Sequence, residues 1–167
     1  MQWTESNAEK RLSELKMPDM PIMQIIPKTT PVESNWFQKY KELCHDFVRS
    51  LGDSVQELAL MNLSRDEFMD LLTGRKIPGN ISFRLKIPLV WGGKLDIDNM
   101  FMCFTFPQSH NLDRFILEQS GNEIIWVPNP SRKIYLPIHS TITGNGGNAV
   151  PDRLNQFAAT VSTNRRQ

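Results

Sequence analysis

The sequence predicts an α+β fold, in which N-terminal helices precede a strand–strand–helix unit and a further β-hairpin, with flexible chain ends. Two observations support this prediction. Apolar residues follow helical spacing up to about residue 74, and from Ile81 onward they alternate with polar residues, as in a half-buried strand. The Gly92-Gly93 pair then favours a turn between this first strand and a second apolar segment.

Length and composition are those of one ordinary folded domain. A chain of 167 residues is long enough to bury a sizeable core. Hydrophobic residues make up 40% and charged residues 22%, which is typical of a soluble globular protein. The net charge is only +1, so the whole chain does not attract nucleic acid, and any such attraction must be local.

Three regions are predicted along the chain. Residues 1–34 read as a leader, because four prolines interrupt any long helix there, although its apolar stretch PIMQIIP leaves open whether it docks on the domain as an extended segment. Residues 35–138 carry the periodic patterns and are expected to form the domain. Residues 139–167 include TGNGGN and end in NRRQ, and this polar composition predicts a flexible tail.

The sequence also bears on location and on the cysteines. No apolar run approaches the ~18 residues that a membrane helix needs. The polar start MQWTESNAEKR is unlike a Sec-type signal peptide, so we expect a cytoplasmic protein or one exported without such a signal. Cys44 and Cys103 lack a CxxC partner and lie in apolar patterns, which predicts two buried free thiols and no thiolate zinc site.

Three helices are predicted before residue 75. The first covers 36–51, where large apolar side chains recur at i, i+3, i+4 and i+7 and predict a buried stripe. A shorter helix follows over 55–61. Ser64 and Glu67 form a capping box for the third, which Gly74 ends. The stripe of the first helix contains Trp36, Phe37, Tyr40, Leu43, Cys44, Phe47, Val48 and Leu51.

The second half of the chain predicts strands and one helix. Residues 83–89 and 100–106 are expected to pair as antiparallel strands, and residues 107–119 to form a helix packed against them. Segments 123–127 and 132–136 flank the turn-forming PNPS and predict one more hairpin. The helix should be buried against the first hairpin through Leu112, Phe115 and Ile116.

The run Leu71–Ile116 carries short motifs in a fixed order. It reads LLTG, PG, KIPL, GG, DIDNM and HNLDRFI. In order and spacing these pieces resemble an HNH endonuclease module, the ββα-metal unit, over about 46 residues. The resemblance implies a ββα unit with a metal-dependent nuclease ancestry. It also implies the setting in which HNH modules are common, namely bacterial toxins, effectors and mobile elements.

The departures from the family pattern fall on the catalytic positions. Arg84 and Leu85 stand where the family has two adjacent histidines, one activating the attacking water and the other supporting the metal. Arginine cannot act as a general base because its pKa lies above ~12, and leucine has no lone pair for a metal. Asn99 matches the central asparagine of the family, and without the histidine it keeps only a structural role in closing the loop.

A metal site is an alternative that the sequence leaves open. His110 matches the first metal histidine of the family helix, and Asp113 stands where the second would be. Residues three apart lie on the same side of a helix. With Asp96 or Asp98 from the loop, they offer a set that can hold Mg²⁺, Mn²⁺ or Zn²⁺. The competing interpretation is a solvated histidine on a helix surface.

Local positive charge suggests phosphate contacts. Arg84, Lys86 and Lys94 gather around the predicted hairpin and are candidates for phosphate binding. The alternative is a solvated polar face. Asp96 and Asp98 lie in the same loop and would oppose a phosphate unless a metal neutralised them, which weakens the case for nucleic acid.

These observations lead to one functional expectation and two alternatives. We expect a catalytically degenerate HNH-like domain that acts by binding, with a protein as the first choice of target and nucleic acid as the second. One alternative is an active metal-dependent nuclease with a rearranged site built from His110, Asp113 and an aspartate of the 96–98 loop. The other is an interaction or inhibitor module unrelated to HNH proteins.

Overall fold

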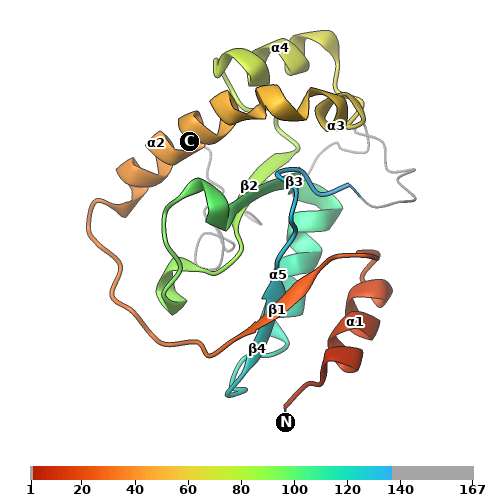
Figure 1. Cartoon of the computed structure of the whole chain (residues 1–167), viewed down its shortest axis with the longest axis vertical. Coiled ribbons are helices and arrows are strands. Elements are labelled where there is room, and N and C mark those ends of the chain that lie inside the picture. Colours follow the sequence, from red (N-terminus) through yellow and green to blue (C-terminus); the bar gives the residue numbers. More distant parts are fainter. Residues whose placement is uncertain (1, 137–167) are drawn as a thin grey trace.

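A two-stranded antiparallel sheet made of β2 (Ile81–Leu85) and β3 (Met100–Phe104) lies at the middle of the computed structural model, which describes residues 2–136 (Figure 1). Ile81 pairs with Phe104 and Leu85 with Met100. The predicted antiparallel pairing is therefore confirmed, but the strands are shorter than predicted, and residues 86–89 and 105–106 lie outside them. The chain is a mixed α+β protein, with helices on both sides of this sheet.

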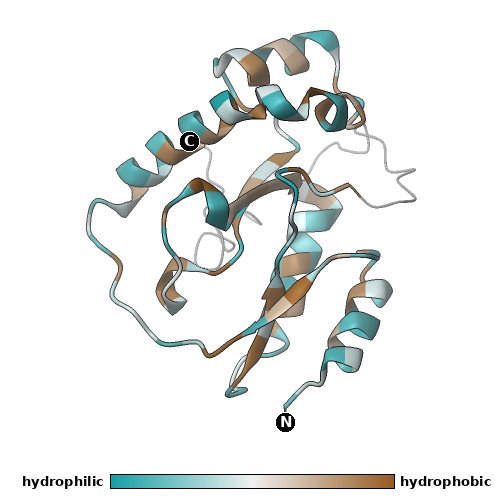
Figure 2. Cartoon of the chain, viewed as in Figure 1, coloured by the Kyte–Doolittle hydropathy of each residue, from teal (hydrophilic) through white to brown (hydrophobic). Residues whose placement is uncertain are grey.

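One face of the sheet is covered by helices from the first half of the chain. These are α2 (Trp36–Arg49), α3 (Val55–Ala59) and α4 (Arg65–Thr73), which lie together above the sheet in Figure 1. Their apolar sides pack on the sheet, and Figure 2 shows α2 alternating between brown and teal residues. The central side chains of this first core are Leu43, Phe47, Leu51, Leu58, Met61, Leu71, Phe83, Leu85, Met100, Met102 and Phe104.

The ends of α4 follow from its sequence. The Ser64 hydroxyl accepts a hydrogen bond from the Glu67 amide, and the Glu67 carboxylate accepts one from the Ser64 amide. This reciprocal capping satisfies two amides that the first helical turn leaves without partners. At the other end Gly74 adopts φ 72°, a left-handed conformation that glycine takes without steric cost. The predicted capping box and helix stop are both confirmed.

The other face of the sheet is covered by α5 (His110–Leu117) and by the N-terminal segment. Leu112, Phe115 and Ile116 are fully buried there, as predicted. The α-helix begins at His110 instead of residue 107, because residues 107–109 belong to a wider helical turn, Thr105–Ser109, in which Phe106 has an extended backbone (φ −125°, ψ 130°). Phe101 and Cys103 of β3 face this second core, on the opposite side of the sheet from Met100 and Met102.

The region predicted as a leader is part of this second core. It contains α1 (Glu5–Glu14) and β1 (Ile22–Ile25), and its helix ends before the first proline. The sequence left its docking open, and the structure shows that it docks with a helix as well as an extended strand. Its buried side chains are Ala8, Leu12, Leu15, Met17 and Met20.

The prediction of a second local hairpin is wrong. β4 (Ile125–Pro128) pairs antiparallel with β1, with Ile22 opposite Pro128, and not with residues 132–136. Residues 133–135 instead lie alongside β3. The Met102 amide donates a hydrogen bond to the Lys133 carbonyl at 2.7 Å. The leader supplies a strand from more than 90 residues away, and local spacing cannot reveal such a partner.

Two further predictions concern the chain ends and membranes. The predicted tail, residues 139–167, lies outside the described residues. Among the described helices, none combines the length and the apolar character that crossing a membrane requires.

Candidate functional site

Arg84 links the central sheet to α5 from a fully buried position. Its Nη1 donates to Oδ1 of Asp113 at 2.8 Å and to the hydroxyl and carbonyl oxygens of Ser109 at 2.8 and 3.0 Å. The side chain of Arg84 is 0% exposed and that of Asp113 is 7% exposed. Because Arg84 lies opposite Phe101 in the strand register, its side chain is on the α5 face of the sheet.

This burial overturns two expectations about Arg84. The sequence predicts a half-buried strand with Ser82 and Arg84 on its polar face, but both faces of β2 are buried. The Ser82 and Thr105 hydroxyls share a hydrogen bond of 2.7 Å. This bond offsets the cost of burying a polar side chain there. Arg84 is therefore not a surface phosphate contact, because its guanidinium is enclosed and already bound to a carboxylate.

The rest of the Arg84 guanidinium is poorly satisfied. Its Nε and Nη2 are buried and have no hydrogen-bond acceptor among residues 2–136, and the same holds for Nε2 of Gln108. An unpaired buried donor typically costs about 1–3 kcal/mol. The contact between β2 and α5 therefore combines one well-coordinated nitrogen with two unpaired ones, and it is far from an optimised ion pair.

Asp113 is held by this contact. Burial raises the pKa of its carboxyl, and the adjacent positive charge of Arg84 offsets part of that effect. A metal at Oδ1 of Asp113 would have to share this oxygen with the guanidinium or displace it. The arginine thus takes the carboxylate that a metal centre at this helix would use.

The four predicted metal ligands do not assemble into a site. Within residues 2–136, no group of three or more histidine, cysteine, aspartate or glutamate side chains is arranged to hold a metal ion. Asp96 uses its Oδ1 to accept a hydrogen bond from the Asn99 amide at 3.1 Å, and Asp98 is exposed. His110 is half-buried, with its ring centroid 6.0 Å from that of Phe106.

Asn99 closes the loop that joins the two strands. Its Oδ1 accepts from the Ile87 amide at 3.0 Å, and its Nδ2 donates to the carbonyls of Ile87 at 3.1 Å and Lys94 at 2.9 Å. The loop is tight, because a Cβ atom at Gly93 would lie 1.8 Å from the Ile87 carbonyl oxygen. Glycine at position 93 and asparagine at position 99 together fix the path between β2 and β3.

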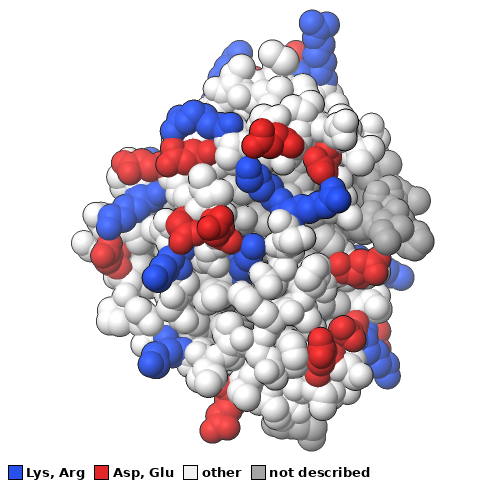
Figure 3. All heavy atoms as spheres, viewed as in Figure 1, with Lys and Arg blue, Asp and Glu red and all other residues white. Residues whose placement is uncertain are grey.

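The remaining phosphate candidates do not form a basic patch with Arg84. Lys94 is exposed and Lys86 is half-buried, and the exposed Asp96 and Asp98 lie in the same loop. On the face in Figure 3, blue and red side chains alternate and neither sign dominates. This surface therefore lacks the concentrated positive charge that phosphate backbones attract.

Two features of the site were not foreseen from the sequence. Ser109 contributes two oxygens to Arg84, and Gln108 accepts a hydrogen bond from the Phe104 amide at 2.8 Å. No sequence signal marks either residue, because each partner is identified only by the fold. The two cysteines match the prediction: both are buried free thiols, and burial raises their pKa values to about 12, so they stay protonated at neutral pH.

Comparison of the chain with protein-family models, curated proteins and solved structures found no match. The resemblance to the HNH module therefore depends on the motifs between Leu71 and Ile116, and its implications for function are a matter for proposal.

Proposed function

We propose that this chain is a catalytically degenerate HNH-like domain that acts by binding a protein partner. The observation that supports this most strongly is the buried contact between Arg84 and Asp113. In the proposed correspondence, a guanidinium cation stands between strand and helix where the family holds a metal, and it neutralises a carboxylate that would otherwise be a ligand.

The HNH-like part of the proposal is supported by local arrangement. An antiparallel strand pair, an intervening loop braced by an asparagine and a following helix occur in the order that the motifs imply. The Gly-Gly turn is required by the close approach at Gly93. These features suit a module whose loop geometry has been kept while its chemistry has been lost.

The degenerate part of the proposal follows from acid–base chemistry. Hydrolysis of a phosphodiester needs a group that takes a proton from water and a charge that stabilises the phosphoryl oxygens. Arginine is too weak a base to take that proton and Leu85 cannot accept one, while His110 belongs to no group of three or more ligand side chains within residues 2–136. Loss of a general base alone typically reduces rates about 10²–10⁴-fold.

A protein is favoured over nucleic acid as the target because of charge. The net charge is +1, Arg84 is buried, and on the face in Figure 3 basic side chains are interspersed with carboxylates. A phosphate-binding surface would need several clustered cations. By its resemblance, the setting proposed for this binding domain is a bacterial effector, toxin-related or mobile-element protein.

The test is a nuclease assay with a divalent-metal panel. The purified chain is incubated with plasmid, single-stranded DNA and RNA in Mg²⁺, Mn²⁺, Ni²⁺ or Zn²⁺, beside the variants His110→Ala and Asp113→Asn. We expect no cleavage above that of a mock purification. Cleavage by the wild type that both folded variants lose would overturn the proposal in favour of a rearranged active site.

A binding measurement separates the two target classes. Fluorescence polarisation of labelled duplex DNA and RNA should show no steep salt dependence, since counterion release requires several phosphate contacts. The matched variant is Lys86→Gln with Lys94→Gln, which removes the surface cations of the motif region. Tight binding that weakens with salt and is lost in this variant would identify nucleic acid as the target.

A further inference from the structure

Residues 2–25 form an arm that is bound almost wholly by the C-terminal half of the domain. Gln2 exchanges two hydrogen bonds with the backbone of Ile124, at 2.6 and 3.1 Å, and the Tyr135 hydroxyl donates to the Pro18 carbonyl at 2.6 Å. β1 then pairs along its length with β4. Every one of these contacts joins residues more than 90 positions apart.

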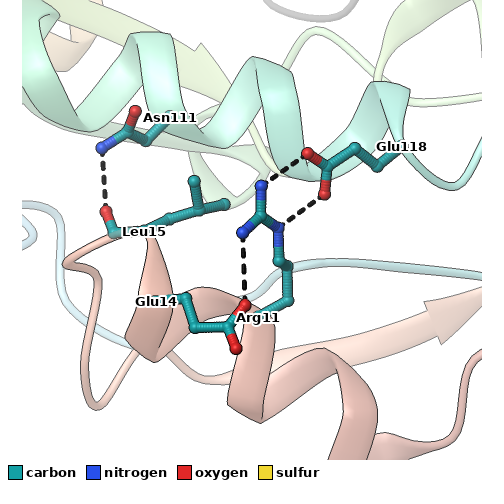
Figure 4. Close-up of polar contacts among 5 residues, drawn as sticks. All are labelled: Arg11, Glu14, Leu15, Asn111 and Glu118. Carbon is teal, nitrogen blue, oxygen red and sulfur yellow. Dashed lines mark hydrogen bonds and ion pairs between the residues drawn. The ribbon is translucent and has the colours of Figure 1, made fainter.

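The arm docks on a surface of α5 and β4, which we call its seat. On α5 it makes both polar and apolar contacts. Figure 4 shows Arg11 holding both carboxylate oxygens of Glu118, at 2.6 Å each, while Nδ2 of Asn111 donates to the Leu15 carbonyl at 2.8 Å. Beneath these contacts the apolar side of the arm is buried, and the Trp3 ring meets Phe115 edge-on at 5.7 Å. The arm thus carries a complete recognition surface for α5 and β4.

The hinge that joins the arm to α2, residues 26–35, is open. None of its residues is buried and none is in a helix or strand, and Figure 1 shows it passing around the outside of the domain. Its Thr30 amide donates to the Val90 carbonyl at 2.9 Å, and at its end the carbonyls of Glu33 and Asn35 accept from amides of the first turn of α2. Ten extended residues reach up to about 35 Å, which is enough to carry the arm to a neighbouring molecule.

The hinge also exposes apolar side chains. Ile26 is 72% exposed and Val32 is 36% exposed. A two-fold dimer that exchanges arms can place the two hinges beside each other at its axis. That position would bring Ile26 and Val32 of one copy against those of the other and remove them from water.

We propose that this chain forms an arm-exchanged dimer, in which residues 2–25 of each copy dock on α5 and β4 of the other. Exchange keeps every contact between arm and seat and adds the hinge contacts. The partner is therefore a second copy of this chain. The dimer gains only the hinge contacts over the monomer, and by mass action its population rises with protein concentration. This inference is independent of the proposed function.

Exchanging the charges of Arg11 and Glu118 tests whether the arm of one copy docks on the other copy. Arg11→Glu alone places two carboxylates together at the seat, and Glu118→Arg alone places two guanidinium groups together. The two full-length variants are unfolded, mixed and refolded. In an exchanged heterodimer, the new carboxylate of the first variant meets the new guanidinium of the second, and the other seat regains the original Arg11–Glu118 pair. The double variant Arg11→Glu/Glu118→Arg restores the pair within one chain and serves as the control for folding.

Native mass spectrometry and light scattering read out the result. We expect a wild-type dimer that increases with concentration, and in the mixture a larger share of heterodimer than random pairing gives. Ile26→Ser should raise the dimer dissociation constant about tenfold or more while leaving the monomer folded. Wild-type protein that stays monomeric at every concentration, or variants that pair only at random, would overturn the proposal.

Discussion

Arg84 places a guanidinium group inside the protein. One of its nitrogens faces three oxygen atoms, whereas Nε and Nη2 face none within residues 2–136. Removing a partner from such a pair leaves an uncompensated buried charge, but replacing both partners with apolar groups is often neutral or favourable. The stability of this contact is therefore a property of the pair and not of either side chain.

A double-mutant cycle tests that statement. Arg84→Met should lower the free energy of unfolding by about 3–5 kcal/mol, because Asp113 is left buried without its cation. Arg84→Met combined with Asp113→Leu should cost clearly less than Arg84→Met alone. Urea denaturation measures these variants and Asp113→Leu alone against wild type. If the two substitutions simply add, the two side chains do not depend on each other and the coupling is absent.

Gly93 should be the least replaceable glycine of the loop. A methyl group there would lie 1.8 Å from the Ile87 carbonyl oxygen, so Gly93→Ala must move backbone and should cost about 1–3 kcal/mol. Gly79→Ala is the control, because nothing lies within 4 Å of the added atom. Thermal unfolding of the two variants should separate them clearly. Equal melting temperatures would show that the loop adjusts freely.

The role of a single residue could be predicted from the sequence where that residue acts on its own neighbours in the chain. Asn99 and Gly93 act on a loop of about a dozen residues, and their motif spacing is visible in the chain. The partners of Arg84 lie 25 and 29 residues away, and only the packing of α5 brings them to it. A charged residue in a strand pattern normally indicates solvent, and burial with an ion partner is the exception.

At the scale of elements, α2 supplies a large apolar contribution to the first core. Phe47 is fully buried, and its ring lies 5.5 Å from that of Phe83 on β2. Phe47→Ala should lower the free energy of unfolding by about 3–5 kcal/mol. Leu60→Ala is a suitable control, since Leu60 is 70% exposed. A loss below about 1 kcal/mol for Phe47→Ala in chemical denaturation would mean that the cavity collapses or that the helix is not anchored there.

The contact of α1 with α5 should depend on pH. Arg11 holds the pKa of the Glu118 carboxyl below its usual value of 4.5, so its contribution is present above pH 4.5 and is lost as pH falls through the lower folded value. Arg11→Gln should therefore be less stable than wild type at neutral pH, by no more than about 1 kcal/mol because the pair is partly exposed. Denaturation at about pH 7 and about pH 3 measures the difference, which should shrink at the lower pH. A gap that is the same at both values would exclude Glu118 as its source.

Elements were predictable from sequence when their stabilising partners were close in the chain. The helix over 65–73 shows its own cap and stop, and the strands β2 and β3 are joined by a recognisable turn. The pairing of β4 failed because its partner β1 comes from the opposite end of the chain. A strand shows its periodicity in its own residues but carries no mark of which other strand it will meet.

At the scale of the whole molecule, the sheet β2–β3 divides two apolar clusters. The first is built by residues 36–104 with Ile134, and the second joins the arm to α5 and β4. The two clusters share β3, whose side chains alternate between them. Loss of the arm would thus remove part of the cover from one side of a strand whose other side is still packed, and it would leave Phe115 and Trp126 more exposed.

The position of the arm in the chain also has a consequence for synthesis. The arm leaves the ribosome before the elements that seat it, and these elements, from β3 to Tyr135, are made roughly 100 residues later. At about 5–20 residues per second, Leu12, Met17 and Met20 wait on the order of 5–20 s without their partners. During that interval the nascent chain presents an apolar segment to chaperones, and a completed seat on a neighbouring chain of the same messenger is the one that the proposed arm exchange would use.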